Sequence, residues 1–154
     1  GTRRDVAAIG AAARRAAGDV RLPVLVLQGV EDTAVASANA DALVVQAIAL
    51  NGGATSGAAP PPPDAEARRT FGERVVHQAD WLVGGRLAAR RLRIEGLGHA
   101  WSGGDGSHDY FDPAPPEATA LILDFLAGQA RQGPGRFRSI LQNTIHPAGA
   151  GNGP

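Results

Sequence analysis

The sequence predicts an α/β fold in which helices flank a parallel sheet. Residues 22–27, with the sequence LPVLVL, form a short continuous apolar run, which is typical of a strand buried on both faces. Strand and helix patterns alternate along the chain, and this order builds a parallel sheet. Two later segments carry apolar residues at helical spacing, one made of Ala40, Leu43, Val44, Ala47 and Ile48 and the other of Ala118, Leu121, Ile122, Phe125 and Leu126.

The first half of the chain is predicted to run helix, strand, loop, helix. Residues 3–17 are rich in alanine and are followed by Gly18, which favours a helix that ends there. The strand over residues 22–27 tolerates Pro23 because a proline is allowed at the first residues of a strand. A loop over residues 28–35 then leads to the second helix, which ends at Asn51-Gly52-Gly53.

The second half begins with an insertion. Residues 52–64 are Gly-, Ala- and Pro-rich and hold four consecutive prolines, so a surface loop is expected there. Residues 74–83 are an extended piece, and the pair Gly84-Gly85 offers a turn before a strand over residues 87–95. Residues 96–112 contain too many glycines for regular structure, and a helix follows from Pro116. Residues 1–131 thus form the folded part, and residues 132–154 are predicted to be a disordered tail.

Composition excludes several classes of function. The 15 basic and 15 acidic residues cancel, without a block of like charge, so no nucleic-acid partner is expected. No apolar run is long enough for a membrane span, and no signal peptide is visible, which leaves the compartment open. The absence of cysteine excludes thiolate chemistry. Since the chain also lacks methionine, we expect it to be a fragment of a longer protein.

Two polar side chains follow the two predicted strands. Asp32 lies in the sequence GVEDTAV after the first, and His99 lies in the sequence GLGHAWSGG after the second. Parallel α/β sheets bind their ligands at the carboxyl ends of the strands, so both loops are expected at the same edge of the sheet. A carboxylate there can fix the tautomer of an imidazole and stabilise its protonated form during acyl transfer.

These two loops resemble those of the polyhydroxybutyrate-depolymerase-like esterases, a branch of the α/β-hydrolases with feruloyl and acetylxylan esterase relatives. GVEDTAV, followed by Asn39-Ala40, resembles the acid turn of that family, and GLGHAWSGG resembles its histidine loop almost residue for residue. The similarity continues through Tyr110 and Asp112-Pro113 and spans roughly residues 22–128, without the proline insertion. Gln28 departs from the pattern, since many relatives have histidine there.

The resemblance implies that the chain is the C-terminal part of an α/β-hydrolase domain, with Asp32 and His99 as catalytic residues and Trp101 as a substrate-binding residue. It implies a carboxylic ester as substrate and no cofactor or metal. The family order is Ser, Asp, His, with the serine in a G-x-S-x-G turn, so the nucleophile is expected upstream of Gly1. None of the five serines has glycine two residues before and two after it: Ser37, Ser56, Ser102, Ser107 and Ser139.

Other interpretations stay open beside this one. Asp32 can simply cap its own turn, His99 can be an ordinary loop histidine, and Trp101 can close the core. His108, with Asp105, Asp109 and Asp112, matches no standard metal spacing. The chain can also be a non-catalytic α/β module, or belong to a prolyl-oligopeptidase-like or dienelactone-hydrolase-like enzyme, although AWSGG argues against the last two. If the sheet lacks neighbouring strands, self-association through its uncovered edge is expected.

Overall fold

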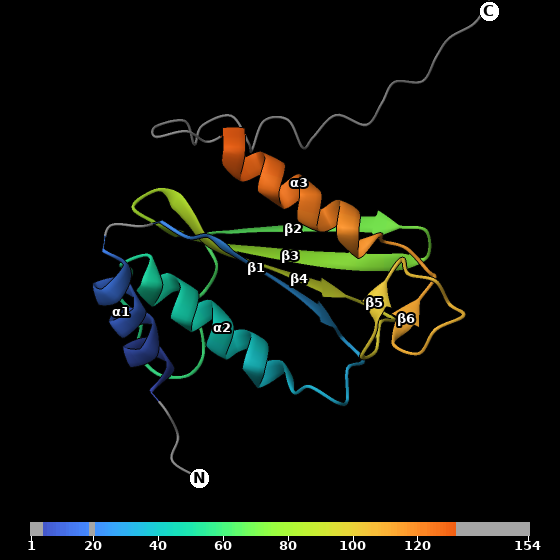
Figure 1. Cartoon of the computed structure of the whole chain (residues 1–154), viewed down its shortest axis with the longest axis horizontal. Helices are drawn as coiled ribbons and strands as arrows, with labels where there is room; N and C mark the ends of the chain where they lie inside the picture. Colours follow the sequence, from blue (N-terminus) through green and yellow to red (C-terminus); the bar gives the residue numbers. More distant parts are fainter. Residues whose placement is uncertain (1–4, 19–20, 132–154) are drawn as a thin grey trace, which may run out of the picture.

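A computed structural model of the chain describes residues 5–18 and 21–131 (Figure 1). The predicted tail, residues 132–154, lies outside this range. The mixed α/β character predicted from the sequence is confirmed, because a four-stranded sheet lies between helices. No helix in the described part of the chain has the length and hydrophobicity needed to cross a membrane.

Helices form where the apolar spacing predicts them. Helix α1 is Val6–Ala17, capped by Asp5, whose side chain accepts a hydrogen bond from the Ala8 amide at 3.1 Å. Helix α2 is Ser37–Leu50 and helix α3 is Ala118–Arg131. Each predicted apolar face holds one exception, since Leu43 on α2 and Leu126 on α3 are about half exposed.

The central sheet is mixed, which corrects the predicted parallel sheet. Its strands are β1 (Val24–Gly29), β2 (Ala65–Phe71), β3 (Arg74–Val83) and β4 (Arg86–Ile94), in the order β1-β4-β3-β2. Only β1 and β4 are parallel, with Leu27 opposite Leu92, whereas β2, β3 and β4 form an antiparallel meander. The physical reason is turn length, because two-residue connections such as Gly84-Gly85 can join only antiparallel strands.

Strand β1 lies at the edge of this sheet, with β4 as its one neighbour in the described sheet. The predicted burial of this strand on both faces is confirmed in part, because Val24 and Val26 pack in the cluster on one face, and Leu25 and Leu27 pack against the cluster on the other. Val26 and Gly29 are buried, while the remaining four residues of β1 are only partly covered. The apolar run thus identifies the strand correctly, but a second strand paired with its other edge is not among the described elements.

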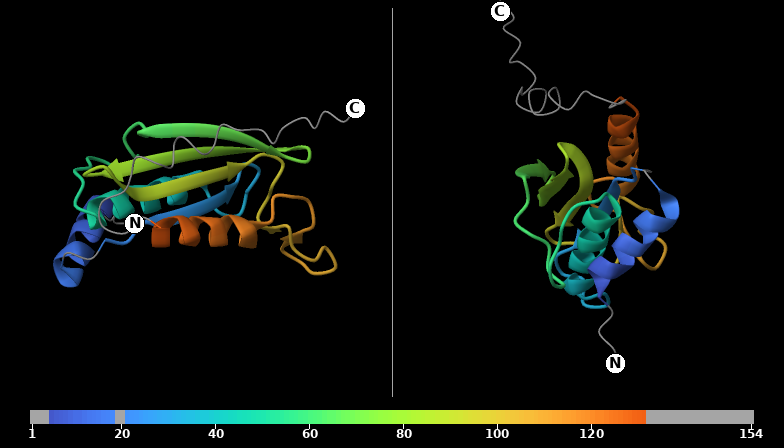
Figure 2. Two further views of the ribbon diagram at one scale, coloured as in Figure 1. Left: turned by 90° about the horizontal axis from the view of Figure 1, so that it is seen from above. Right: turned by 90° about the vertical axis from the view of Figure 1, so that its left-hand side faces the viewer.

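Helices α2 and α3 lie on different sides of the sheet (Figure 2), and an apolar cluster covers each face. On one face α2 packs on the first cluster, through Val44 and Ile48, and α1 packs on the outside of α2. On the other face α3 places Leu121 against Val76, Leu92 and Ile94. Because successive side chains of a strand point to opposite faces, β3 and β4 contribute to both clusters.

The predicted insertion has no regular structure over residues 54–64, as expected, yet its end is anchored to β3. The Trp81 indole donates a hydrogen bond to the Pro61 carbonyl at 2.7 Å, and the Leu82 amide donates to the Asp64 carboxylate at 2.7 Å. The predicted irregular loop after β4 contains one small exception. Its strands β5 (Trp101–Ser102) and β6 (Phe111–Asp112) form a short parallel pair.

Candidate functional site

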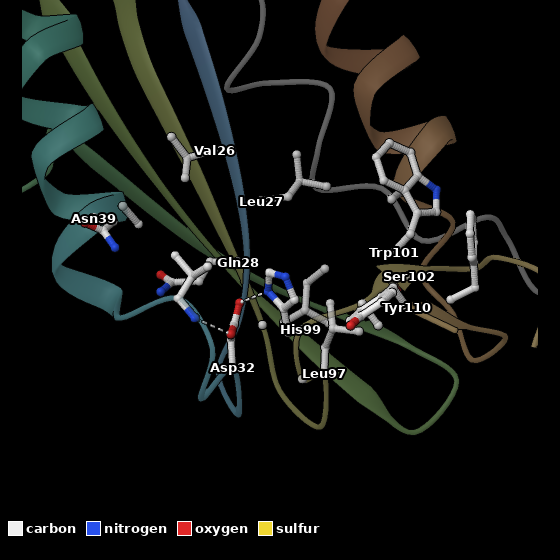
Figure 3. Close-up of a pocket in the computed structure, with 18 of the residues that line it drawn as sticks. Val26, Leu27, Gln28, Asp32, Asn39, Leu97, His99, Trp101, Ser102 and Tyr110 are labelled. Atoms are coloured by element: carbon white, nitrogen blue, oxygen red, sulfur yellow. Dashed lines mark hydrogen bonds and ion pairs between the residues drawn. The ribbon is translucent and has the colours of Figure 1, made fainter. Parts of the chain in front are cut away.

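The two loops predicted to carry chemistry meet at one edge of the sheet. Asp32 follows β1 and His99 follows β4, and these two strands are parallel neighbours. His99 Nδ1 lies 3.0 Å from Asp32 Oδ2, although the two residues are 67 positions apart in the sequence. Figure 3 shows this contact at the ends of the strands. The predicted proximity of the carboxylate and the imidazole is thus observed.

Gly29 allows the two loops to approach this closely. A Cβ atom at this position would lie 2.2 Å from the Leu97 carbonyl oxygen and 2.4 Å from that of Gly98, distances that no side chain tolerates. Beyond Gly29 the pairing of the strands continues, as the Glu31 amide donates a hydrogen bond to the Leu97 carbonyl at 3.0 Å. Backbone contacts therefore hold the start of both loops close together, independently of the side-chain contact between Asp32 and His99.

The Asp32 carboxylate is held by three hydrogen bonds. Oδ1 accepts from the amides of Ala34 and Val35, at 2.9 and 2.8 Å, while Oδ2 faces His99. The Val35 amide, followed by the His99 side chain, lowers the pKa of Asp32 below its ordinary value. Asp32 is therefore ionised at neutral pH. The turn-capping role that competed with the catalytic interpretation is present here together with the histidine contact.

This carboxylate determines which nitrogen of His99 carries the proton. An ionised carboxylate accepts hydrogen bonds only, so the neutral imidazole must place its proton on Nδ1. The second nitrogen, Nε2, then has a free lone pair, and it points away from Asp32 (Figure 3). Since the His99 side chain is 49% exposed, compared with 11% for Asp32, the imidazole is the accessible member of the pair.

A cavity of about 550 Å³ adjoins the imidazole. Its walls come from β1, the start of α2, the loop after β4 and the start of α3. Most of the lining side chains are apolar, among them Leu27, Leu43, Leu97, Trp101, Phe111 and Ile122. A basic imidazole at the wall of an apolar cavity is typical of a site that binds an organic substrate and transfers protons.

Trp101 and Ser102 lie in the same wall with opposite exposure. Trp101 is 45% exposed, so it does not close the core; its role in substrate binding stays a prediction. Ser102 is buried, and its hydroxyl donates a hydrogen bond to the Pro116 carbonyl at 2.6 Å. That hydroxyl is engaged with the backbone, which argues against Ser102 as a nucleophile.

Arg74 is a residue of this region that the sequence did not single out. Its guanidinium donates to the carbonyls of Gly96 and Ala114, at 2.6 and 3.2 Å, and to the Asp112 carboxylate at 2.6 Å. Arg74 therefore joins the two ends of the loop that carries His99. The Arg74 side chain also lowers the pKa of Asp112. Since Arg74 begins β3 and precedes these partners by 22 to 40 residues, no local pattern could reveal the contact.

The other polar residues considered from the sequence are placed differently. His77, for which the sequence identified no partner, contacts Glu95 across the sheet, with Nε2 2.5 Å from Oε1. His108 lies 4.0 Å from Asp105, and within residues 5–18 and 21–131 no three His, Asp or Glu side chains are grouped as metal ligands. The Gln28 Oε1 atom is buried without a hydrogen-bond partner in the described structure. His146 lies outside the described residues.

No known family model matches this chain. A search of curated proteins likewise finds no significant relative.

The geometry of the site and the two loop motifs are therefore the features of this chain that bear on its function. Among the described residues the structure brings together an ionised carboxylate, an imidazole of defined tautomer and an apolar cavity. This arrangement can accept a proton at His99 Nε2 and stabilise the resulting positive charge through Asp32.

Proposed function

We propose that this chain supplies the acid and the histidine of a carboxylic-ester hydrolase of the α/β-hydrolase type. The observation that supports this most strongly is the hydrogen bond from His99 Nδ1 to Asp32 Oδ2, which leaves Nε2 beside the apolar cavity. The resemblance of both loops to those of polyhydroxybutyrate-depolymerase-like esterases agrees with this assignment.

In the proposed mechanism His99 Nε2 removes the proton from a serine hydroxyl while the serine oxygen attacks the ester carbonyl. The imidazolium that forms is stabilised by Asp32, and it then gives the proton to the departing alcohol. Water hydrolyses the acyl-enzyme by the same route, with His99 again as the base. The proposed reaction needs no cofactor, because His99 performs each proton transfer and Asp32 stabilises the imidazolium without taking up the proton.

The nucleophile in this proposal comes from a segment outside the chain. Ser102 is buried, and its hydroxyl donates a hydrogen bond to the Pro116 carbonyl. Ser37 is the first residue of α2 and precedes the apolar residues of that helix in the sequence. In hydrolases of this type the serine and the oxyanion donors precede the acid and the histidine in the sequence. We therefore assign the serine and the oxyanion hole to residues encoded before Gly1.

The open edge of β1 supports this placement of the missing part. The β1 backbone has β4 on one side only, and its apolar side chains are partly exposed on both faces. In the proposed enzyme a further strand pairs with this edge and brings the serine to the cavity beside His99.

As an isolated polypeptide the chain is expected to behave differently. Loss of the nucleophile alone lowers the turnover of a serine hydrolase by roughly a million-fold, so the chain should be almost inactive. An unpaired strand edge with apolar side chains is also a template for association. We therefore propose that the isolated chain self-associates through β1.

The proposal can be tested by assaying two polypeptides for cleavage of p-nitrophenyl butyrate and for labelling by a serine-directed phosphonate. One is this chain, and the other is this chain preceded by the residues that its gene encodes before Gly1. We expect cleavage and labelling only in the longer polypeptide. A folded longer polypeptide without either property would favour a non-catalytic α/β module, and cleavage by the short chain would mean that the nucleophile has been misplaced.

A further inference from the structure

Tyr110 has an unusual backbone conformation. With φ at 64° it is the one residue other than glycine with a positive φ in the described part of the chain. The left-handed region is unfavourable for a residue with a Cβ atom, and tyrosine lacks the short polar side chain that lets asparagine adopt it. The same loop uses glycine freely, at positions 103, 104 and 106, so glycine would be the unstrained choice at position 110.

The Tyr110 side chain does not compensate for this strain by packing in the core. It is 72% exposed, and its hydroxyl forms no hydrogen bond to another described residue. Its ring instead contacts the imidazole of His99, with ring centroids 6.0 Å apart and planes at 82° (Figure 3). Strain retained at an exposed residue beside a candidate catalytic group indicates a role in that site.

The backbone of Tyr110 is held by a hydrogen bond to its carbonyl and by the short strand that follows it. The Tyr110 carbonyl accepts a hydrogen bond from the Trp101 amide at 2.7 Å, and the next residue, Phe111, belongs to β6. Trp101 is two residues after His99 on the same loop. The strained backbone of Tyr110 is thus hydrogen-bonded directly to the segment that carries the imidazole.

His99 needs such a contact because its imidazole is otherwise held by one hydrogen bond. Half of the side chain is exposed, and this one bond must compete with a flipped ring orientation, in which Nδ1 turns away from Asp32 and the Nε2–H tautomer can form. An edge-to-face aromatic contact restricts the plane of the ring. We infer that Tyr110 is a positioning residue that holds the His99 imidazole with Nδ1 toward Asp32 and Nε2 toward the cavity.

This inference rests on the proposed role of His99, but its test needs no ester cleavage. Two-bond nitrogen–proton correlation NMR of the isotope-labelled chain reports which imidazole nitrogen carries the proton, at a pH about two units above the ordinary imidazole pKa of about 6.5. In the unmodified chain His99 should be the Nδ1–H tautomer. In Tyr110→Gly the ratio of Nδ1–H to Nε2–H should fall roughly two- to tenfold, the range expected for the loss of one aromatic contact.

Controls separate positioning from a general effect on the fold. Tyr110→Phe keeps the ring and should retain the His99 tautomer of the unmodified chain. His77, which lies on β3 and contacts Glu95, should keep its NMR signals in both variants. If the His77 signals of Tyr110→Gly also change, Tyr110→Asn replaces it, because asparagine tolerates the left-handed backbone. An unchanged His99 tautomer in a folded Tyr110→Gly or Tyr110→Asn chain would overturn the inference, whatever the outcome of the ester assays.

Discussion

Removal of the Arg74 side chain is expected to destabilise the protein through the loop that carries His99. Arg74→Ala deletes hydrogen bonds to the carbonyls of Gly96 and Ala114 and the ion pair with Asp112. The side chains of Arg74 and Asp112 are 14% and 25% exposed, so solvent screens the pair only in part. Hydrogen bonds to charged groups each contribute roughly 1.5–3 kcal/mol, and because these three overlap and are partly solvated we expect a total loss of about 2–4 kcal/mol.

The assay is urea unfolding followed by circular dichroism, with thermal unfolding as a second measurement. For a fold of this size each kcal/mol corresponds to a shift in Tm of roughly 3–5 °C. Arg86→Ala is the matched control, because Arg86 is exposed at the opposite end of β4 and forms no hydrogen bond to a described residue. Its effect should stay within about 0.5 kcal/mol.

The pH dependence of this loss supplies an independent check. Since Arg74 lowers the pKa of Asp112 in the folded chain, their interaction stabilises the fold above the ordinary carboxyl pKa and is lost as the pH falls through the lowered value. The difference in stability between the unmodified chain and Arg74→Ala should therefore shrink below about pH 4. A loss no larger than that of Arg86→Ala, or a difference that does not depend on pH, would mean that Arg74 does not stabilise this loop through Asp112.

Three further predictions concern the fold and the approach of the two loops. The pKa values of Asp32 and Glu95 are lowered in the folded state, so the free energy of unfolding should fall as the pH drops below about 4. Urea titrations at several pH values measure this free energy, and a free energy that stays constant below about pH 4 would contradict the prediction. Ile94→Ala removes a fully buried side chain and should cost about 2–5 kcal/mol in urea unfolding, and a cost under 1 kcal/mol would contradict the core described above. Gly29→Ala places a Cβ against the Leu97 carbonyl and should cost roughly 1–3 kcal/mol. Gly128→Ala in α3, where the new Cβ meets no atom within 4 Å beyond its chain neighbours and the nearby helix backbone, should be neutral or stabilising, and equal effects of the two substitutions would argue against the close approach.

Local patterns predicted the helices and the first strand because these depend on residues near one another in the sequence. The apolar stripes located α2 and α3, and the run in residues 22–27 located β1 to within two residues. The sheet topology was only partly predictable. Strand β2 has the sequence AEARRTF and lies at an edge with much of its surface in water, so its apolar pattern is too weak to identify it.

The part of the candidate site that directly follows the strands was predictable from the sequence. Asp32 and His99 each follow a strand, and parallel neighbours bring those ends together. The supporting contacts were not predictable, since Arg74 acts across 22 to 40 residues and the strain at Tyr110 is a property of its backbone. Gly29 lay within a motif, but only the distance to the Leu97 carbonyl explains why glycine is needed there.

Asp32 and His99 are proposed to act together in ester cleavage, and the decisive experiment uses the longer polypeptide that includes the residues encoded before Gly1. The measurement is the rate of p-nitrophenyl butyrate cleavage by His99→Ala and Asp32→Asn, with the exposed His108→Ala as control. We predict a loss of about a million-fold for His99→Ala and about ten-thousand-fold for Asp32→Asn, with His108→Ala unchanged. Full activity in folded His99→Ala and Asp32→Asn variants would contradict the claim.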